Sequence, residues 1–305
     1  MSAAVNGTAM PRRVTIVEVA PRDGLQNEKQ HVSADDKVEL IDALAAAGLT
    51  RIEATSFVNP KRVPQMADAD EVMARVDRGS GVSYSGLALN PKGAERAITA
   101  GCDEITYVAV ASETFSQRNQ GRGVDAVLAD LAGVAAATRS AGRFLSVCVA
   151  TAFGCPFDGR VSAETVTDIV KRILDHEPDE IGLADTIGVG VPSQVTDLFG
   201  RVGELTALPR RAHFHNTRNT GFANVYAALQ AGVSVFDSSA GGLGGCPFAP
   251  RATGNIATED LVYMLDGMGI ASGVDLAQVA GLDAWLAGKV GHAVPGQLGK
   301  AGAFP

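Results

Sequence analysis

The stretch VTIVEVAPRDGLQNEKQHVSADDKVELIDALAAAGLTRIEATS, residues 14–56, contains the pattern from which the fold can be predicted. It begins with a short apolar run at 14–19, continues with a helix-length amphipathic stretch at 33–47 and ends in a second apolar run at 50–56. Ser33 followed by acidic residues is typical of a helix start, because the hydroxyl can cap the helix and acids favour its first turn. A strand, a helix and a second strand in this order predict two parallel strands.

The same alternation continues along the chain and predicts a barrel. Short apolar runs, typical of strands buried on both faces, lie at 14–19, 50–56, 82–89, 104–111, 145–151, 179–185, 211–215 and 233–239. Helix-length stretches follow them at 33–47, 64–76, 91–100, 124–141, 162–175, 192–206, 219–231 and 258–268. Eight such units favour an α/β TIM (β/α)8 barrel, with extra C-terminal helices expected over 272–290. We expect one catalytic domain over 14–305, preceded by a short polar extension over 1–13.

Composition and charge narrow the classes of function. The 305 residues are 46% hydrophobic and 20% charged, which suits a globular protein with a sizeable core, and the formal net charge is −8. No basic block is present, so we expect no nucleic-acid partner. No apolar run has the length of a membrane span, so we expect no membrane partner. Four widely spaced cysteines without a C-x-x-C pair indicate a reducing compartment, which we expect to be the cytoplasm. A homodimer is expected because many such barrels pair.

The ends of the strands are where a barrel of this kind carries its active site. Pro21 and Gly24 turn the chain after the first strand, which allows Arg22 and Asp23 both to face the barrel mouth. A solvated ion pair on a loop is the alternative for these two residues. Glu53 lies within the second strand, where a buried carboxylate needs a partner, and Arg22 is the candidate.

A histidine pair marks the seventh strand. His213 and His215 are two residues apart, which places both imidazoles on one face of the strand. With Asp23 they form a set of two histidines and one carboxylate, to which Asn255 can add a carbonyl oxygen. Asp185 is a further acid at the end of a strand. Mixed oxygen and imidazole ligands without a thiolate favour Mg²⁺ or Mn²⁺, but iron oxygenases use a similar ligand count, so the ligands alone leave the reaction open.

These residues fall within five motifs spread from the first strand to the last barrel helix. The motifs are VEVAPRDGLQNEK (17–29), IEATSFVNPKRVPQMAD (52–68), DTIGVG (185–190), HFHNT (213–217) and SSAGGLGGCPFAPRATGNIATEDLVYML (238–265). With them the chain resembles the hydroxymethylglutaryl-CoA lyases, a family of the DRE-TIM metallolyases whose fold is a TIM barrel. The resemblance implies an acyl-CoA substrate and a metal-dependent carbon–carbon lyase. Such an enzyme cleaves 3-hydroxy-3-methylglutaryl-CoA to acetyl-CoA and acetoacetate, in leucine or other acyl-CoA catabolism.

The resemblance also implies roles for individual residues. The implied metal ligands are Asp23, His213, His215 and Asn255. The residues implied to take part in catalysis are Arg22, Asp23, Glu53, Asp185, His213 and Cys246. Those implied to contact substrate or CoA are Arg22, Gln26, Lys29 and Ser56. Arg22 would stabilise the developing enolate, while Glu53 and Asp185 would orient Arg22 and the substrate or a proton-carrying group. Glu259, one helical turn beyond Asn255, would support the metal site.

Cys246 belongs to the glycine-rich stretch between the eighth strand and the helix that follows it. So many glycines cost backbone entropy on ordering, about 0.5–1 kcal/mol each relative to alanine. A loop that closes over a ligand, or that lets backbone come close, accounts for them. The resemblance implies that this loop delivers Cys246 to the active site. The alternative is that Cys246 is a small apolar residue in a tight loop.

Four positions depart from the pattern common in the family. Asn216 and Arg218 stand where aspartate and tyrosine are frequent, Gly182 stands where serine is common, and Arg251 follows the cysteine loop. These positions leave the acyl group open, so the alternatives include a lyase for a related 3-hydroxy-3-alkylglutaryl-CoA or for citramalyl-CoA. A Claisen-type acyl-CoA synthase of the same superfamily, a metal-dependent oxo-acid aldolase and a non-catalytic barrel that binds acyl-CoA or metal are the further alternatives.

Overall fold

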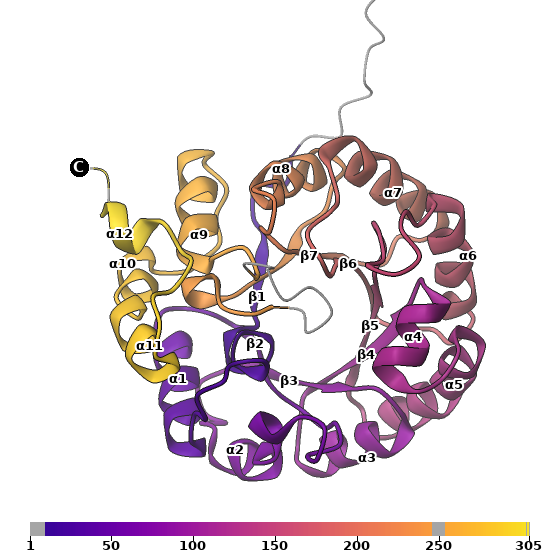
Figure 1. Ribbon diagram of the computed structural model, residues 1–305, viewed down its shortest axis with the longest axis horizontal. Helices are drawn as coiled ribbons and strands as arrows, with labels where there is room; N and C mark the ends of the chain where they lie inside the picture. The colour runs from indigo at the N-terminus through magenta and orange to yellow at the C-terminus, as the bar shows by residue number, and fades with distance from the viewer. Residues whose placement is uncertain (1–9, 246–253, 303, 305) are drawn as a thin grey trace, which may run out of the picture.

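The computed structural model of the protein describes residues 10–245, 254–302 and 304. Its strands form a closed parallel barrel in which each strand pairs with its neighbours in sequence and β8 pairs with β1 (Figure 1). The strands are β1 (Thr15–Glu18), β2 (Arg51–Ser56), β3 (Ser83–Ala88), β4 (Glu104–Val110), β5 (Phe144–Ala150), β6 (Glu180–Asp185), β7 (Arg210–Phe214) and β8 (Val235–Ser238). The predicted TIM barrel is therefore confirmed.

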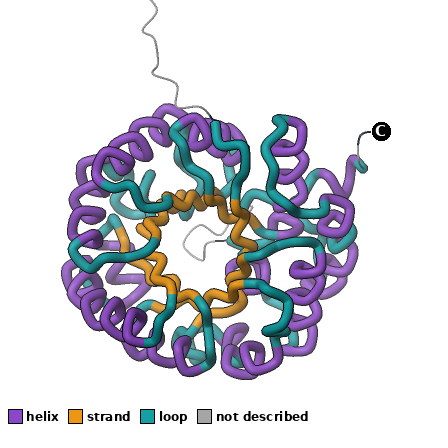
Figure 2. Tube along the Cα trace, turned by 180° about the vertical axis from the view of Figure 1, so that it is seen from behind, coloured by secondary structure: helices purple, strands orange, loops and turns teal. Residues whose placement is uncertain are grey.

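An outer ring of helices surrounds the strands, as Figure 2 shows in purple around the orange inner ring. The helices that follow β1 to β8 in turn are α1 (Ala34–Ala46), α2 (Ala69–Arg75), α3 (Pro91–Thr99), α5 (Val124–Ser140), α6 (Ala163–Leu174), α7 (Pro192–Leu205), α8 (Gly221–Gln230) and α9 (Thr258–Gly267). The hydroxyl of Ser33 accepts the N–H of Asp36, so the helix start predicted there is confirmed. The hydroxyl of Ser162 caps α6 in the same way, by accepting the N–H of Thr165. In the part of the chain that the structure describes, no helix combines the length and apolar character that a membrane span requires.

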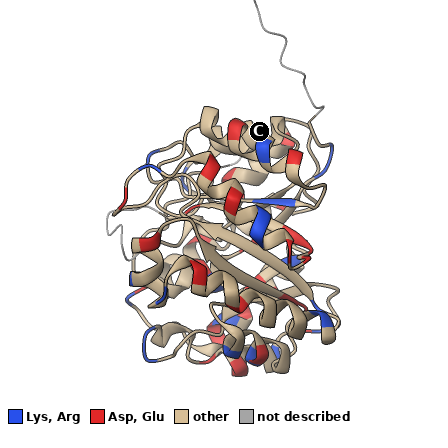
Figure 3. Ribbon diagram, turned by 90° about the vertical axis from the view of Figure 1, so that its right-hand side faces the viewer, with Lys and Arg blue, Asp and Glu red and all other residues tan. Residues whose placement is uncertain are grey.

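Extra helices follow the barrel, as predicted. They are α10 (Leu276–Ala280), α11 (Asp283–Val290) and α12 (Leu298–Ala301), which lie beside α9 in Figure 1. On the face shown in Figure 3, acidic and basic residues are interspersed over the outer helices.

Two short elements differ from the prediction. The helix expected over 64–76 is divided into a 3-10 turn, η2 (Pro64–Met66), and α2, and the ammonium group of Lys37 donates to the carbonyl oxygen of Gln65 within that turn. An unpredicted helix, α4 (Glu113–Gln120), follows β4. Its eight residues, ETFSQRNQ, are mostly polar and show no apolar stripe. Ser112 caps its start, and Gly121 ends it with a φ of 73°.

Successive side chains of each strand point alternately towards the surrounding helices and into the barrel. Most strand residues that face the helices are apolar and buried; among them, six are at most 1% exposed: Ile52, Tyr107, Val149, Leu183, Phe214 and Phe236. At the N-terminal end of the barrel, Arg51 donates to Glu104 at 2.6 Å and to Glu180 at 2.9 Å. These residues begin β2, β4 and β6, so alternate strands supply one layer. This layer closes the N-terminal end and leaves the cavity at the opposite end.

Candidate metal centre and active site

Three side chains able to bind a divalent cation lie together at the C-terminal mouth of the barrel. Asp23, His213 and His215 each offer one ligand atom, and these atoms lie within 4.8 Å of one another. The two histidines are buried, and the side chain of Asp23 is 13% exposed. The structure therefore brings together the carboxylate and the two imidazoles selected from the sequence.

Local backbone structure explains how Asp23 reaches the histidines. After β1 the chain forms one turn of π-helix, η1 (Ala20–Gly24), in which the N–H of Gly24 donates to the carbonyl oxygen of Val19 at 3.1 Å. A Cβ atom on Gly24 would lie 2.8 Å from the hydroxyl oxygen of Ser239, so glycine allows this turn to pack against the end of β8. His213 lies on β7 and His215 directly follows its last residue, so the alternation of extended backbone points both side chains the same way.

Asp237 on β8 orients the first histidine of the pair. Its Cα atom is the register partner of His213, and its Oδ2 atom lies 2.9 Å from Nδ1 of that ring. Burial would lower the pKa of His213, but the hydrogen bond and charge of Asp237 outweigh burial and raise it. A carboxylate on one ring nitrogen leaves the other, Nε2, available to a metal ion. Sequence analysis missed Asp237, although an acid at the end of a predicted strand was a usable signal.

The donor atoms around Asp23 fit a cation. Burial would raise the pKa of Asp23, but Arg22 and the two imidazoles hold it far below its usual range, so the carboxylate is ionised. Asn255 donates through Nδ2 to Asp23 at 2.8 Å and to the carbonyl oxygen of Leu243 at 3.0 Å. Its Oδ1 atom and Nδ1 of His215 are buried and lack a hydrogen-bond partner among the described residues. An unpaired buried acceptor costs free energy, which coordination of the Asn255 oxygen to a cation would relieve.

Glycine at two positions lets backbone approach Asn255. Gly244 has a φ of +121°, and a Cβ atom there would lie 2.4 Å from Nδ2 of Asn255. Gly254 has a φ of +99°, and a Cβ atom there would lie 2.2 Å from the carbonyl oxygen of Gly244. These contacts account for glycine at both ends of the cysteine-containing segment. Cys246 and Arg251 themselves lie outside the described residues.

Arg22 lies between two carboxylates at the edge of the cluster. Its Nη1 atom is 2.5 Å from Oδ1 of Asp23, and its Nε atom is 2.5 Å from Oε1 of Glu53. Glu53 is fully buried, and the side chain of Arg22 is 11% exposed. The predicted pairing of Glu53 with Arg22 is confirmed. Two anions thus fix a guanidinium group beside the candidate metal site.

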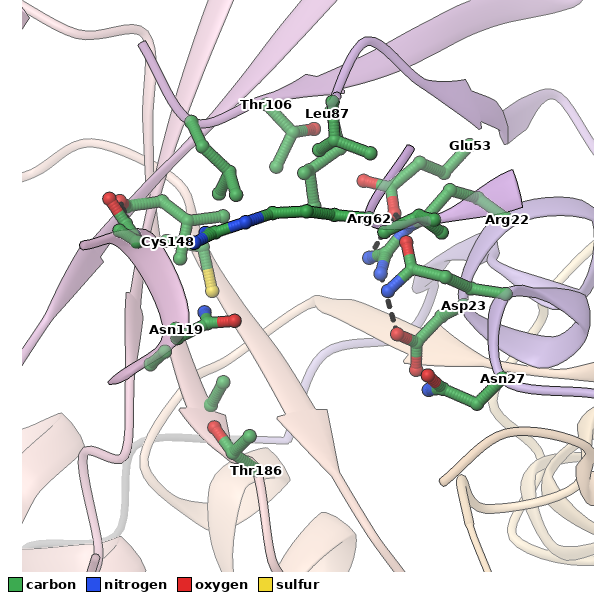
Figure 4. Close-up of a pocket in the computed structure, with 18 of the residues that line it drawn as sticks. Arg22, Asp23, Asn27, Glu53, Arg62, Leu87, Thr106, Asn119, Cys148 and Thr186 are labelled. Carbon is green, nitrogen blue, oxygen red and sulfur yellow. Dashed lines mark hydrogen bonds and ion pairs between the residues drawn. The ribbon is translucent and has the colours of Figure 1, made fainter. Parts of the chain in front are cut away.

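These groups line a cavity of about 740 Å³ that opens at the barrel mouth. Figure 4 shows Arg22, Asp23 and Glu53 on one side of it and Thr106, Cys148 and Thr186 on the other. Gln26 and Lys29 also line the cavity. Ser56 is not among the described lining residues; it is buried and donates to Oε1 of Gln26 at 3.4 Å. Among the described residues, Gln26 is the link between Ser56 and the cavity.

Asp185 stabilises a loop. Its two carboxylate oxygens accept the N–H groups of Val189 and Gly190, each at 2.9 Å. Burial raises its pKa. Within the described ranges, no hydrogen bond joins Asp185 to Arg22, so its observed contacts fix the loop between β6 and α7.

Glu259 is buried behind the glycine-rich segment. Its Oε2 atom accepts the N–H of Gly241 at 3.0 Å, and its Oε1 atom is without a hydrogen-bond partner in the described chain. Burial and, secondarily, the charge of Asp283 raise the pKa of Glu259 to about 8. Glu259 thus supports the 3-10 turn η3 (Ala240–Gly242), which precedes the segment that holds Asn255.

Asn216 and Arg218, two of the positions that depart from the family pattern, make hydrogen bonds to neighbouring loops. Oδ1 of Asn216 accepts the N–H of Gly221 at 3.2 Å, and Nη1 of Arg218 donates to the carbonyl oxygens of Ile187 at 3.0 Å and Gly188 at 2.8 Å. Neither Asn216 nor Arg218 is among the described lining residues of the cavity. Both join neighbouring loops.

Gly182 is a point of close packing between strands. A Cβ atom on Gly182 would lie 3.2 Å from the Cα and Cβ atoms of Cys148 on β5. Cys148 in turn lines the cavity. The absence of a side chain at 182 therefore affects the cavity wall through its neighbour.

Arginines that sequence analysis missed also line the cavity. Arg62 lies across it in Figure 4. Arg118 lies on the unpredicted helix α4, with its guanidinium carbon 4.1 Å from the ring centroid of Phe157. Both arginines are exposed, Arg62 in a turn and Arg118 on a polar helix, so neither belongs to an apolar period and only the fold places them beside the cavity.

Fold and site together define a TIM-barrel protein of the metalloenzyme type, with a histidine–carboxylate cluster at the C-terminal ends of its strands. The chain belongs to the HMGL-like family, whose family model matches residues 13–285. The (R)-citramalyl-CoA lyase of Chloroflexus aurantiacus is 43% identical over 303 residues, covering 95% of each chain. The hydroxymethylglutaryl-CoA lyase of Pseudomonas mevalonii is 44% identical over 289 residues, covering 94% of this chain and 93% of that one.

A solved structure shows the same architecture. The HMG-CoA lyase from Acinetobacter baumannii, in complex with coenzyme A and 3-methylmalate, superposes with a TM-score of 0.93. It is 40% identical, and the match covers 98% of this chain and 99% of that one. The resemblance found in the sequence motifs is therefore confirmed at the level of the family.

Proposed function

We propose that the protein is a divalent-metal-dependent carbon–carbon lyase that cleaves 3-hydroxy-3-methylglutaryl-CoA to acetyl-CoA and acetoacetate. The observation that carries this proposal is the fixed guanidinium of Arg22 beside the cluster of Asp23, His213 and His215 in one cavity. Relatives named as hydroxymethylglutaryl-CoA lyases support it, including the mitochondrial enzyme of Rattus norvegicus at 46% identity over 271 residues. That match covers 88% of this chain and 83% of the relative.

The residues proposed to hold the cation are Asp23, His213, His215 and Asn255. Their oxygen and imidazole donors suit Mg²⁺ or Mn²⁺. When bound, such a cation supplies Lewis-acid polarisation of hydroxyl and carbonyl oxygens. The Oδ1 atom of Asn255, which has no hydrogen-bond partner among the described residues, supports its inclusion in the ligand set.

Arg22 is proposed to stabilise charge that develops as the bond breaks. In a retro-Claisen cleavage the 3-hydroxyl group loses its proton and becomes the ketone of acetoacetate. The electrons of the C2–C3 bond form a thioester enolate, which is then protonated at C2 to give acetyl-CoA. A guanidinium already held by Glu53 and Asp23 meets the enolate oxygen with little reorganisation.

Further residues are proposed to complete the site. Gln26 and Lys29 line the cavity and are proposed to contact substrate or the anionic CoA moiety. Asp185 is proposed to act by fixing the loop after β6. Cys246, outside the described residues, is proposed to assist catalysis because the motif over 238–265 resembles that of the lyases.

Cleavage of citramalyl-CoA is the second candidate function. The relative named (R)-citramalyl-CoA lyase is 43% identical and matches 95% of both chains. The two substrates share a 3-hydroxyacyl thioester and differ by one methylene group, which a binding site discriminates by only about 1–3 kcal/mol. The shared site therefore suits either substrate, and the measurement below separates them.

Purified protein with Mg²⁺ or Mn²⁺ should release acetyl-CoA and acetoacetate from 3-hydroxy-3-methylglutaryl-CoA, as measured by mass spectrometry. EDTA should abolish this release. Arg22→Lys keeps the positive charge but loses the planar guanidinium group, and it should slow the release. Metal-dependent cleavage of citramalyl-CoA alone, with pyruvate as the second product, would favour the second candidate. Failure to cleave either thioester would refute the lyase assignment.

The cellular setting is also part of the proposal. We place the protein in the cytoplasm because three of its widely spaced cysteines, Cys102, Cys148 and Cys155, are unpaired. We assign it to leucine or other acyl-CoA catabolism and expect a homodimer, with residues 14–305 as one catalytic domain and 1–13 as an extension. Light scattering on purified protein tests the dimer.

A further inference from the structure

Arg211 is a buried arginine on β7, two residues before His213 and therefore on the same, inward face of the strand. It is 3% exposed and borders the deep end of the cavity. Its guanidinium lies close to carboxylates from three other strands: Asp237 on β8, Glu53 on β2 and Glu180 on β6. This side chain therefore joins the ion pairs at the N-terminal end of the barrel to the functional mouth.

Asp237 and Glu53 each contact Arg211 through one carboxylate oxygen and a residue of the candidate site through the other oxygen. Oδ1 of Asp237 accepts Nε of Arg211, while its Oδ2 lies 2.9 Å from Nδ1 of His213. Oε2 of Glu53 is 3.7 Å from Nη2 of Arg211, while its Oε1 accepts Nε of Arg22 at 2.5 Å. One guanidinium thus contacts both the anion that orients a candidate metal ligand and the anion that orients the catalytic arginine.

The contacts form a continuous chain in which an imidazole is followed by alternating anions and cations. It runs through His213, Asp237, Arg211, Glu53, Arg22 and Asp23. Its two ends, His213 and Asp23, are both members of the candidate metal cluster. Buried charges of this kind have few rotamers that keep every partner, so movement of one member displaces its neighbours.

We infer that Arg211, acting through Asp237 and Glu53, is a positioning residue that fixes His213 and Arg22 in one mutual geometry. Arg211 holds the carboxylate of Asp237 so that its second oxygen meets Nδ1 of His213 and leaves Nε2 for the metal ion. Its charge also balances Glu53, whose Oε2 atom has no hydrogen-bond partner in the described part of the chain. The inference about Arg22 rests on the proposed function, whereas the inference about His213 requires only that the cluster binds a cation.

The test measures Mn²⁺ binding by calorimetry on Arg211→Met and Asp237→Asn, with folding verified by circular dichroism. Loss of a group that orients a metal-ligating histidine lowers metal affinity about 10–100-fold, and we expect losses of that size in both variants. The double variant should lose less than the product of the two single losses, because both residues act on the same ring. Asp237→Asn also keeps the inference testable if Arg211→Met fails to fold.

Arg51→Met is the matched control. Arg51 is a similarly enclosed arginine that pairs with Glu104 and Glu180. Among the described residues it makes no hydrogen bond or ion pair with Asp237 or Glu53. The Arg51→Met substitution should lower the free energy of unfolding and leave the affinity for Mn²⁺ unchanged. Unchanged Mn²⁺ affinity in folded Arg211→Met and Asp237→Asn proteins would overturn the inference. So would an equal loss of affinity in Arg51→Met, because that would reveal a general effect of destabilisation.

Metal binding separates this inference from the proposed function. If the wild-type protein binds Mn²⁺ and the variants bind it more weakly, the effect on His213 holds even when no thioester is cleaved. Where cleavage is observed, Arg211→Met should lower kcat more than it changes KM, because Arg22 is misplaced rather than removed. Arg211→Lys, which restores the charge, should recover part of the lost kcat; the absence of any recovery would overturn the electrostatic link to Arg22.

Discussion

Replacing Glu259 by glutamine should change how the stability of the protein depends on pH. Glu259 is fully buried on α9, and its Oε1 atom has no hydrogen-bond partner among the described residues. Burial, followed by the charge of Asp283, raises the pKa of Glu259 from 4.5 to about 8. Between these two values the folded protein holds a proton that the unfolded chain releases. The contribution of this carboxyl group to the free energy of unfolding is therefore fully present below about pH 4.5 and is lost as the pH rises towards 8.

The size of the effect follows from proton linkage. A pKa difference contributes about 1.4 kcal/mol for each pH unit in the window between the two values. Raising the pH from 5 to 7.5 should therefore cost the wild-type protein about 3 kcal/mol through Glu259. Glu259→Gln removes this contribution. Burial also raises the pKa of Glu18, to about 7, but Glu18 is present in both proteins and cancels from the difference.

The assay is urea unfolding of the wild-type and Glu259→Gln proteins at several pH values between 5 and 7.5. The free energy of unfolding of the variant, relative to wild type, should rise by about 3 kcal/mol across this range. Asp266→Asn is the control, because Asp266 is an exposed acid at the end of the same helix. Its curve should run parallel to that of wild type. A parallel curve for Glu259→Gln would refute the reasoning that burial keeps this carboxyl group protonated.

Three further changes test the candidate site. Mn²⁺ at a hundred times its Kd should raise the free energy of unfolding of the wild-type protein by about 2.7 kcal/mol. His215→Ala should abolish this increase in a thermal unfolding assay, and an unchanged increase would exclude His215 as a ligand. Arg22→Lys should lower kcat about 10²–10³-fold, because a preorganised group for developing negative charge is displaced, and full turnover would contradict that role. Cys246→Ala should lower turnover without changing the unfolding midpoint, and an unaltered kcat would favour the view of Cys246 as a small loop residue.

Much of the site could be predicted because strand periodicity is a local property of the sequence and the repeated alternation of strands and helices implies a barrel. A spacing of two places His213 and His215 on one face of a strand, and parallel barrel strands end at one mouth. A buried glutamate within a strand requires a cation, and Arg22 was the nearest candidate in the predicted topology. The ion pair of Arg22 with Glu53 confirms this reasoning.

Tertiary structure alone decided which side chains from distant parts of the chain meet. The register of β7 against β8 pairs His213 with Asp237, and closure of the barrel places Arg211 near carboxylates of β2, β6 and β8. Helix α4 is short and polar, so its capping contacts define it instead of an apolar period. The sequence by itself determined the barrel and the residues that face its mouth, because periodicity records which face of each element is buried. It could not specify their partners, because those pairings depend on strand register and loop packing across the closed barrel.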